Sequence, residues 1–244
     1  MVHCRSESTI IQLLQYRRNK EYDVERLPKS GITSDVLNEA TAAFISTVIQ
    51  EMGPKATQLC LKDTTYFQLL DVLDDLFPKS KFILMVRDPR AAVASVIMQD
   101  IKRGHKSQNI TTTILDYEEI AEQMLEDCQY IGKRRCLFIR YECLVLNSRF
   151  EIQKILDFLG LPWSNKFLED ENMEGNIFMQ HKYKVNSYQI IRPIHRDSLY
   201  SWSKKNSVLS EKYIKFMNKN STLLKALHYL TETVPPNYES LCHK

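Results

Sequence analysis

The sequence predicts an α/β fold, a three-layer arrangement in which a parallel sheet is covered by helices on both faces. Short apolar segments with the character of strands alternate along the chain with longer segments that have the periodicity of helices. The segment 82–86 is five apolar residues without alternation, which is typical of a strand buried on both faces. With 244 residues the chain is long enough for one substantial domain, so we expect a single domain over residues 1–244.

The elements expected before this strand begin with a helix over residues 6–18 and a polar loop over 19–30. A helix then runs from residue 34 to 49, capped at residues 33–35, with Leu37, Ala40, Phe44, Ile45 and Val48 on one face. A short strand over residues 58–62 and a helix over 66–76 lead to the central strand.

After the central strand the pattern predicts helices over residues 91–102 and 114–130, then a second strand over 136–141. A helix over 149–159 should end at Gly160 and Pro162. Residues 169–191 carry mixed polar and apolar residues and read as a long excursion or lid. A last helix is expected over 211–230.

The central strand ends abruptly at the sequence Arg87-Asp88-Pro89-Arg90. Proline suits the first turn of a helix, because its missing N–H has no partner there. Two arginines and Ser95 therefore follow the carboxyl end of a buried strand, which is the edge where open α/β sheets bind ligands and where helix N-termini favour anions. The alternative is that Arg87 and Arg90 only form ion pairs with Asp88 and neighbouring carboxylates.

Composition excludes some classes of partner. A net charge of +3 is too small to indicate a nucleic-acid-binding protein, although it is compatible with a locally basic cleft. No apolar run approaches the roughly 20 residues of a membrane helix, and residues 1–7 do not resemble a signal peptide. Taken alone, these features indicate the cytoplasm.

The six cysteines point to an oxidising compartment instead. Cys128 and Cys136 flank a short turn-like segment that a disulfide could close. A metal site is less favoured, because no Cys-x-x-Cys pair or nearby histidine completes a tetrahedral set. The sequons at Asn109 and Asn220 are compatible with a glycoprotein of the secretory pathway.

The sequence Val86-Arg-Asp-Pro-Arg90, with Ser95 eight positions after Arg87, resembles the 3′-phosphate-binding segment of sulfotransferases. These enzymes use 3′-phosphoadenosine 5′-phosphosulfate (PAPS) and have a P-loop-like α/β fold. Three further segments narrow the resemblance to the protein-tyrosine sulfotransferases: Leu-Phe-Pro-Lys-Ser-Lys-Phe at 76–82, Ile-Leu-Asp-Phe-Leu-Gly-Leu-Pro-Trp at 155–163, and Pro-Pro-Asn-Tyr at 235–238. The resemblance covers nearly the whole chain.

This resemblance implies transfer of a sulfuryl group from PAPS, without a metal, to tyrosine hydroxyls in acidic stretches of secreted or membrane proteins. It also implies a location in the Golgi lumen and a possible homodimer. A second disulfide would join Cys4 to Cys60 and leave Cys143 and Cys242 free.

The resemblance also assigns roles to single residues. Glu7 matches the catalytic base and Lys62 the lysine that neutralises charge on the leaving oxygen. The expected cofactor-binding residues are Arg87 and Ser95 at the 3′-phosphate, Tyr141 at the nucleotide, and Arg192 where the family has a lysine. Each also has a structural reading: Glu7 as a residue of a helix first turn, Lys62 as a surface partner of Asp63, and Tyr141 as a packed strand-end residue.

Several family features are absent from these 244 residues. The Pro-Arg-Ser-Gly-Thr-Thr loop that cradles the 5′-phosphosulfate would lie upstream, so the domain is expected to be N-terminally incomplete, with a membrane anchor only in a longer parent protein. Gln99 and Thr9 stand where the family has arginines, and Phe178–His181 replaces a serine-rich loop. The alternatives are therefore an inactive homologue that binds a nucleotide or a partner and, more remotely, a generic phosphate-binding domain. We expect weak nucleotide binding without useful transfer by these residues alone.

Overall fold

The computed structural model describes residues 2–5, 29, 31–51, 55–62, 69–102, 109–164 and 196–242. It divides into two compact units, one formed by residues 1–82 and 123–136 and the other by 83–122 and 137–244. The expected helix over 6–18 and the expected lid over 169–191 lie outside the described residues. The single-domain organisation stays a prediction.

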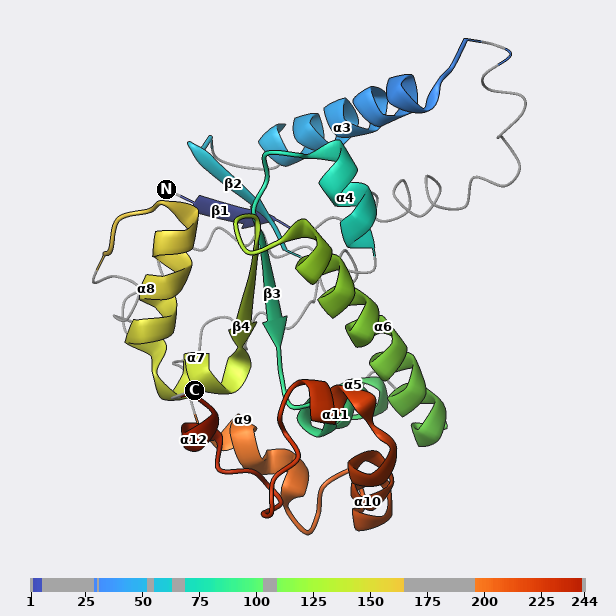
Figure 1. Ribbon diagram of the computed structural model, residues 1–244, viewed down its shortest axis with the longest axis vertical. Helices are drawn as coiled ribbons and strands as arrows, with labels where there is room; N and C mark the ends of the chain where they lie inside the picture. Colours follow the sequence, from blue (N-terminus) through green and yellow to red (C-terminus); the bar gives the residue numbers. More distant parts are fainter. Residues whose placement is uncertain are drawn as a thin grey trace. The chain divides into compact units, whose positions relative to one another are not determined.

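The first unit contains a parallel pair of strands, β1 (Val2–Arg5) and β2 (Gln58–Leu61), which Figure 1 draws side by side. The register pairs Val2 with Gln58 and Cys4 with Cys60. The strand β2 was predicted, whereas β1 was not. Four residues next to the chain start carry too short a pattern to indicate a strand, and the pairing with β2 supplies the missing constraint.

Two helices supply the core of the first unit, α3 (Ser34–Glu51) and α4 (Leu70–Leu76). Ile45 is fully buried in a cluster with Leu69, Leu73 and Leu76, and each such side chain contributes about 1.5–3 kcal/mol by leaving water. The predicted apolar face of α3 is partly wrong. Thr41 is buried, whereas Phe44 is 42% exposed. The reason is that the helix face packed against α4 contains Thr41, Ile45 and Val48, which are spaced i, i+4 and i+7.

The strands β3 (Phe82–Val86) and β4 (Cys136–Arg140) form a second two-stranded sheet. They lie side by side in Figure 1 with their arrows pointing the same way, and α5 (Pro89–Lys102) and α6 (Ile110–Ile131) connect them. This strand–helix–strand connection confirms the α/β class and the parallel direction. Leu84 and Val86 are buried but Met85 is 45% exposed, so among the described residues β3 buries one face rather than both.

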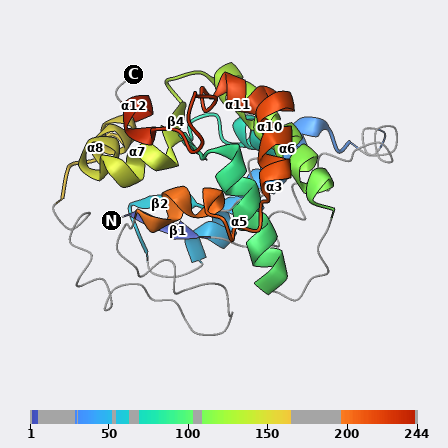
Figure 2. The ribbon, with the colours of Figure 1, turned by 90° about the horizontal axis from the view of Figure 1, so that it is seen from below.

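The remaining described elements of the second unit are helices. Its elements are α7 (Tyr141–Leu146), α8 (Ser148–Leu159), α9 (Asp197–Tyr200), η6 (Ser201–Ser203), α10 (Glu211–Asn220), α11 (Thr222–Ala226) and α12 (Tyr238–Cys242). Gly160 ends α8 in the left-handed conformation, at φ 73°, as predicted. Figure 2 shows α7 beside both α8 and α12.

The prediction of one continuous helix over 211–230 is wrong, because the helix breaks at Ser221. The Ser221 hydroxyl accepts a hydrogen bond from the Leu224 N–H at 3.0 Å and caps α11. A serine that satisfies a helix N-terminus in this way competes with the continuing helix. The apolar periodicity is common to both helices and so did not reveal the break.

Each unit contains a disulfide bridge. The predicted bridge between Cys128 and Cys136 is confirmed and joins the end of α6 to the start of β4. Cys60 is also disulfide-bonded, and the sheet register places it opposite Cys4; the bridge between Cys4 and Cys60 stays a prediction. The expectation that Cys143 and Cys242 are free is wrong, since they form a disulfide between α7 and α12.

The long-range bridge should contribute more to stability than the short one. In the chain-entropy description a loop of about 100 residues is worth roughly 4.7 kcal/mol and a loop of about 9 residues roughly 2.5 kcal/mol; the sequence separations here are 99 and 8. We expect the pair Cys143→Ala/Cys242→Ala to lower the free energy of unfolding more than Cys128→Ala/Cys136→Ala, as measured by urea titration. Equal losses, or an unchanged midpoint for the first pair, would contradict this.

Candidate functional site

The ends of β3 and β4 bring two predicted site residues together. Arg87 follows β3 directly, and Tyr141 follows β4 as the first residue of α7. The Arg87 guanidinium carbon lies 4.8 Å from the centroid of the Tyr141 ring, which is a cation–π contact. Parallel strands end at the same edge of a sheet, so residues that are distant in the chain become neighbours.

A third residue, Ser198 of α9, contacts both side chains. Its carbonyl oxygen accepts a hydrogen bond from Arg87 Nη2 at 2.6 Å, and its hydroxyl is hydrogen-bonded to the Tyr141 hydroxyl at 2.8 Å. Sequence reasoning missed Ser198, because nothing local marks a serine that lies 111 residues from its partner. We call Arg87, Tyr141 and Ser198 the strand-end cluster.

The Arg87 guanidinium keeps donor capacity that the described part of the protein does not use. Its Nε is buried and has no hydrogen-bond partner among the residues that the structure describes. Buried polar groups are nearly always paired, so a buried donor without a protein partner is a candidate for binding a ligand or an ion. An arginine with such a donor can still bind an anion.

The second arginine of the motif behaves differently. Arg90 is only 1% exposed, and its Nε and Nη2 donate to Asp88 Oδ1 and Oδ2 at 2.9 and 2.7 Å. Its remaining donors reach the Asn218 side chain at 2.8 Å and the Tyr229 carbonyl at 3.0 Å. Among the described residues, the ion-pair alternative therefore holds for Arg90 and not for Arg87.

Asp88 also occupies the N-terminus of α5. Its Oδ1 accepts the Arg90 backbone N–H at 2.9 Å, as an N-cap residue does. The helix end that we expected to favour a ligand anion is thus already satisfied by a side chain of the protein. Ser95 lies further along α5, where it is half-buried.

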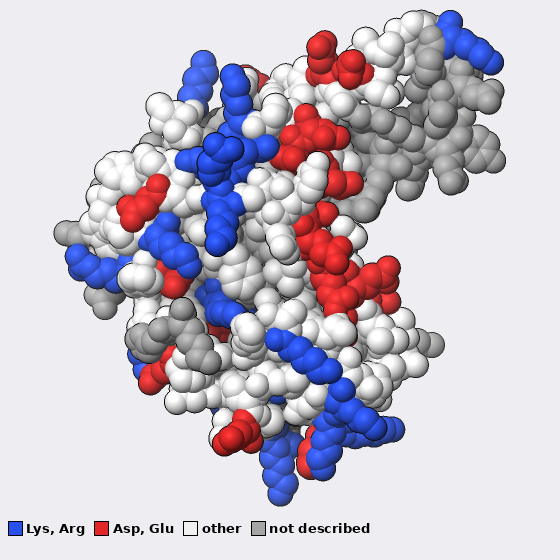
Figure 3. All heavy atoms as spheres, in the orientation of Figure 1, with Lys and Arg blue, Asp and Glu red and all other residues white. Residues whose placement is uncertain are grey.

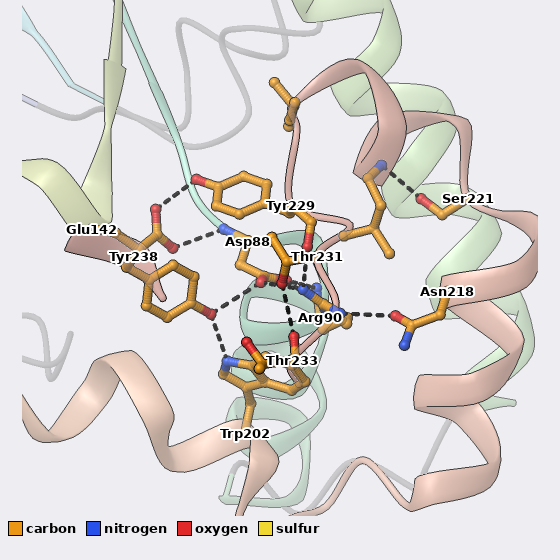
Figure 4. Close-up of polar contacts among 12 residues, drawn as sticks. Asp88, Arg90, Glu142, Trp202, Asn218, Ser221, Tyr229, Thr231, Thr233 and Tyr238 are labelled. Atoms are coloured by element: carbon orange, nitrogen blue, oxygen red, sulfur yellow. Dashed lines mark hydrogen bonds and ion pairs between the residues drawn. The ribbon is translucent and has the colours of Figure 1, made fainter. Parts of the chain in front are cut away.

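Asp88 and Glu142, which follow Arg87 and Tyr141 in the chain, belong to a buried set of polar residues (Figure 4). Glu142 accepts the Asp88 backbone N–H at 2.8 Å through Oε1 and the Tyr229 hydroxyl at 2.6 Å through Oε2. Asp88 Oδ2 accepts the Tyr238 hydroxyl at 3.0 Å, and the Trp202 indole N–H donates to that hydroxyl at 3.0 Å. We call Asp88, Arg90, Glu142, Tyr229 and Tyr238 the carboxylate network.

Burial governs the electrostatics of this network. Loss of solvent raises the pKa of the Glu142 carboxyl, and its hydrogen bonds from Asp88 and Tyr229 oppose the rise only in part. Burial, followed by the charges of Glu142 and Asp88, also raises the pKa values of Tyr229 and Tyr238 above the ordinary tyrosine range. Both phenols therefore stay neutral and act as hydrogen-bond donors.

The remaining predicted site residues lie in the first unit or outside the described residues. Lys62 directly follows β2 in the first unit and is exposed. Glu7 and Arg192 lie outside the described residues, as do Thr9 and residues 178–181. Their assigned roles stay predictions.

On the face that Figure 3 shows, basic side chains of the described residues also gather away from the strand-end cluster. Figure 3 shows Lys and Arg side chains gathered where Figure 1 draws α10, and in that helix Lys212, Lys215 and Lys219 are exposed. Lys215 pairs with Glu211 at 2.7 Å. Among the described residues there is no cluster of His, Cys, Asp and Glu suited to a metal ion, and no helix both long and apolar enough to cross a membrane.

Removing the Arg90 side chain should strongly destabilise the fold. In Arg90→Met the Asp88 carboxylate stays buried without its cation, and breaking a buried pair in this way costs about 3–5 kcal/mol. Lys215→Met removes an exposed pair and serves as the control, with an unchanged unfolding midpoint. A denaturant titration in which the two variants shift equally would show that the buried pair has no special role.

A sequence profile described as "Sulfotransferase family" matches residues 6–165. The chain is 29% identical to protein-tyrosine sulfotransferase A of Caenorhabditis elegans over 97% of this chain and 63% of that protein. It is 32% identical to protein-tyrosine sulfotransferase of Drosophila melanogaster over 97% of this chain and 48% of that protein. A putative protein-tyrosine sulfotransferase of Caenorhabditis briggsae is 30% identical, over 86% of this chain and 74% of the relative.

The chain thus spans 63% and 48% of the length of the first two relatives. Among solved structures, the sulfotransferase domain of the Synechococcus PCC 7002 olefin synthase is similar with a TM-score of 0.49 and 16% identity, over 89% of this chain and 92% of that one. The sulfotransferase domain from the curacin biosynthetic pathway gives a TM-score of 0.49 and 14% identity, over 86% of this chain and 77% of that one.

Proposed function

The chain belongs to the sulfotransferase family, and from this premise we propose that it acts in the transfer of a sulfuryl group from PAPS to tyrosine hydroxyls. The relatives named protein-tyrosine sulfotransferases support tyrosine as the acceptor. The observation that carries the proposal in this chain is the contact between Arg87 and Tyr141 at the ends of two neighbouring strands.

The strand-end cluster is suited to the 3′-phosphate end of the nucleotide. A guanidinium binds a phosphate through two parallel N–H···O bonds, and Arg87 has a buried Nε without a partner among the described residues. We assign Arg87 and Ser95 to the 3′-phosphate, Tyr141 to the nucleotide, and Arg192 to a further phosphate contact. The surrounding protein holds the guanidinium in place, which lowers the entropic cost of binding.

The reaction itself needs a base, a cation and alignment. A phenol has a pKa of about 10 and is almost entirely protonated at neutral pH, so we assign Glu7 to remove its proton as the oxygen attacks sulfur. The bond between sulfur and the bridging phosphate oxygen breaks, and adenosine 3′,5′-bisphosphate leaves. We assign Lys62 to neutralise the charge that develops on that oxygen. This scheme requires no metal.

We further propose that the substrates are acidic tyrosine-containing stretches of secreted or membrane proteins, and that the chain works in the Golgi lumen. The disulfides at Cys128–Cys136 and Cys143–Cys242 fit an oxidising compartment. The sequon residues Asn109 and Asn220 are exposed, as glycosylation requires. A homodimer and a membrane anchor in a longer parent protein belong to the same proposal.

An inactive homologue that binds a nucleotide or a partner remains the second candidate. The changes at Thr9, at Gln99 and over residues 178–181 favour it, because they remove groups that the family uses near the base and the nucleotide. Nucleotide binding without transfer under conditions that saturate the site would distinguish this candidate from the enzyme.

Arg87→Ala should reduce the affinity for adenosine 3′,5′-bisphosphate by about 100-fold or more, because a partly buried phosphate would lose a charged two-point partner. Arg87→Lys keeps the charge without the fork and should give an intermediate loss. Exposed Arg134→Ala is the matched control and should bind like the parent. Isothermal titration calorimetry measures all three, and parental affinity in Arg87→Ala would remove Arg87 from the site.

Transfer by residues 1–244 alone should be slow even where the nucleotide binds. These residues contain no glycine-rich loop to hold the phosphosulfate, and a misplacement of about 1 Å can already cost roughly 100-fold. The measurement is sulfation of a tyrosine peptide flanked by aspartates, followed by mass spectrometry. Robust sulfation would contradict this expectation, and Glu7→Gln and Lys62→Ala should then each eliminate turnover while leaving nucleotide affinity largely intact.

A further inference from the structure

We propose that Glu142 is a positioning residue that fixes the Arg87 guanidinium against the Tyr141 ring. The inference rests on the proposed function for its purpose, since it treats these two side chains as the nucleotide-binding pair. All the contacts on which it is based join described residues of the second unit. Glu142 is not expected to contact the substrates itself.

Each residue of the binding pair is followed in the chain by a buried carboxylate: Arg87 by Asp88 and Tyr141 by Glu142. The hydrogen bond from the Asp88 N–H to Glu142 Oε1, at 2.8 Å, links the two strand ends. That N–H belongs to the peptide plane between Arg87 and Asp88, so the bond sets the orientation of the backbone from which the Arg87 side chain departs.

The carboxylate that makes this link is held on its other side as well. Glu142 Oε2 accepts the Tyr229 hydroxyl at 2.6 Å, and Figure 4 shows the two donors approaching the carboxylate from different elements. An ionised carboxylate has acceptors only, so both of its oxygens match the donors that they face. A glutamine at this position would direct an NH₂ group at one of them.

Stability alone does not explain a carboxylate here. Glu142 is 2% exposed, and its carboxylate accepts hydrogen bonds from backbone N–H groups and a phenol, none of which is a cation. Among the described residues, the charged groups near it include Asp88, which Arg90 neutralises, and Arg140, whose guanidinium carbon lies 5.1 Å from the centroid of the Tyr229 ring. Burying a charge without a cationic partner costs free energy. We infer that the carboxylate serves instead to fix the geometry at the two strand ends.

The test compares Glu142→Gln with Glu151→Gln. Glu151 is a matched control, because it is also a buried glutamate of the second unit, 5% exposed, and its carboxylate contacts Lys154 of α8. The first readout is the NMR shift of the Arg87 side chain in the ligand-free protein, which the Tyr141 ring current perturbs in the parent. We expect Glu142→Gln to lose this ring-current shift and Glu151→Gln to keep it. An unchanged shift in Glu142→Gln overturns the proposal.

The second readout is the affinity for adenosine 3′,5′-bisphosphate. We expect a loss of about 10-fold in Glu142→Gln, the equivalent of one lost hydrogen bond, and no loss in Glu151→Gln. Equal losses in the two variants overturn the proposal, because they would reflect destabilisation alone. A parent that does not bind the nucleotide contradicts the proposed function, while the ligand-free shift still decides the positioning role.

A second variant keeps the proposal testable if Glu142→Gln does not fold. Tyr229→Phe removes one donor and leaves the Glu142 carboxylate bound to Asp88 through a single oxygen. The Arg87 ring-current shift should then be reduced but not lost. A shift identical to that of the parent counts against the proposal.

Discussion

The second unit depends on the buried ion pair between Asp88 and Arg90. Asp88 is fully buried and Arg90 nearly so, and such a pair is stable only when its remaining donors and acceptors are satisfied. The unit does this with residues from α5, α7, α10 and α12 and from the segment between α11 and α12, so those elements have to meet at one point. Arg87, immediately before the pair in the chain, is thereby held at the boundary between the carboxylate network and the strand-end cluster.

Much of this arrangement follows from local sequence rules. The strand over 82–86, the start of the next helix at Pro89 and the glycine end of α8 were predicted from apolar runs, proline geometry and glycine geometry, and the structure has all three. The Cys128–Cys136 bridge was predicted in the same way from a short loop. Each of these features depends on residues within a few positions of one another.

The features that escaped prediction depend on contacts between distant residues. Arg87 and Arg90 are identical in chemistry, and only their surroundings distinguish them: Arg90 is enclosed by its partners, whereas Arg87 keeps a donor without a partner among the described residues. The Pro-Pro-Asn-Tyr segment supported the family resemblance, but the role of Tyr238 as a donor to Asp88 spans 150 residues and becomes visible only in the structure. Glu7 and Arg192 lie outside the described residues, so their part of the site rests on sequence alone.

The bridge between Cys143 and Cys242 has a topological consequence. It closes a covalent ring that contains every residue from 143 to 242, including α8, α9, α10 and α11. A single backbone cut anywhere inside that ring opens it without dividing the molecule, because the two fragments stay joined through sulfur. A chain that has been nicked there migrates as one species until a reductant is added. Tyr229 and Tyr238, which lie inside the ring, stay covalently joined to Asp88, Arg90 and Glu142, which lie outside it.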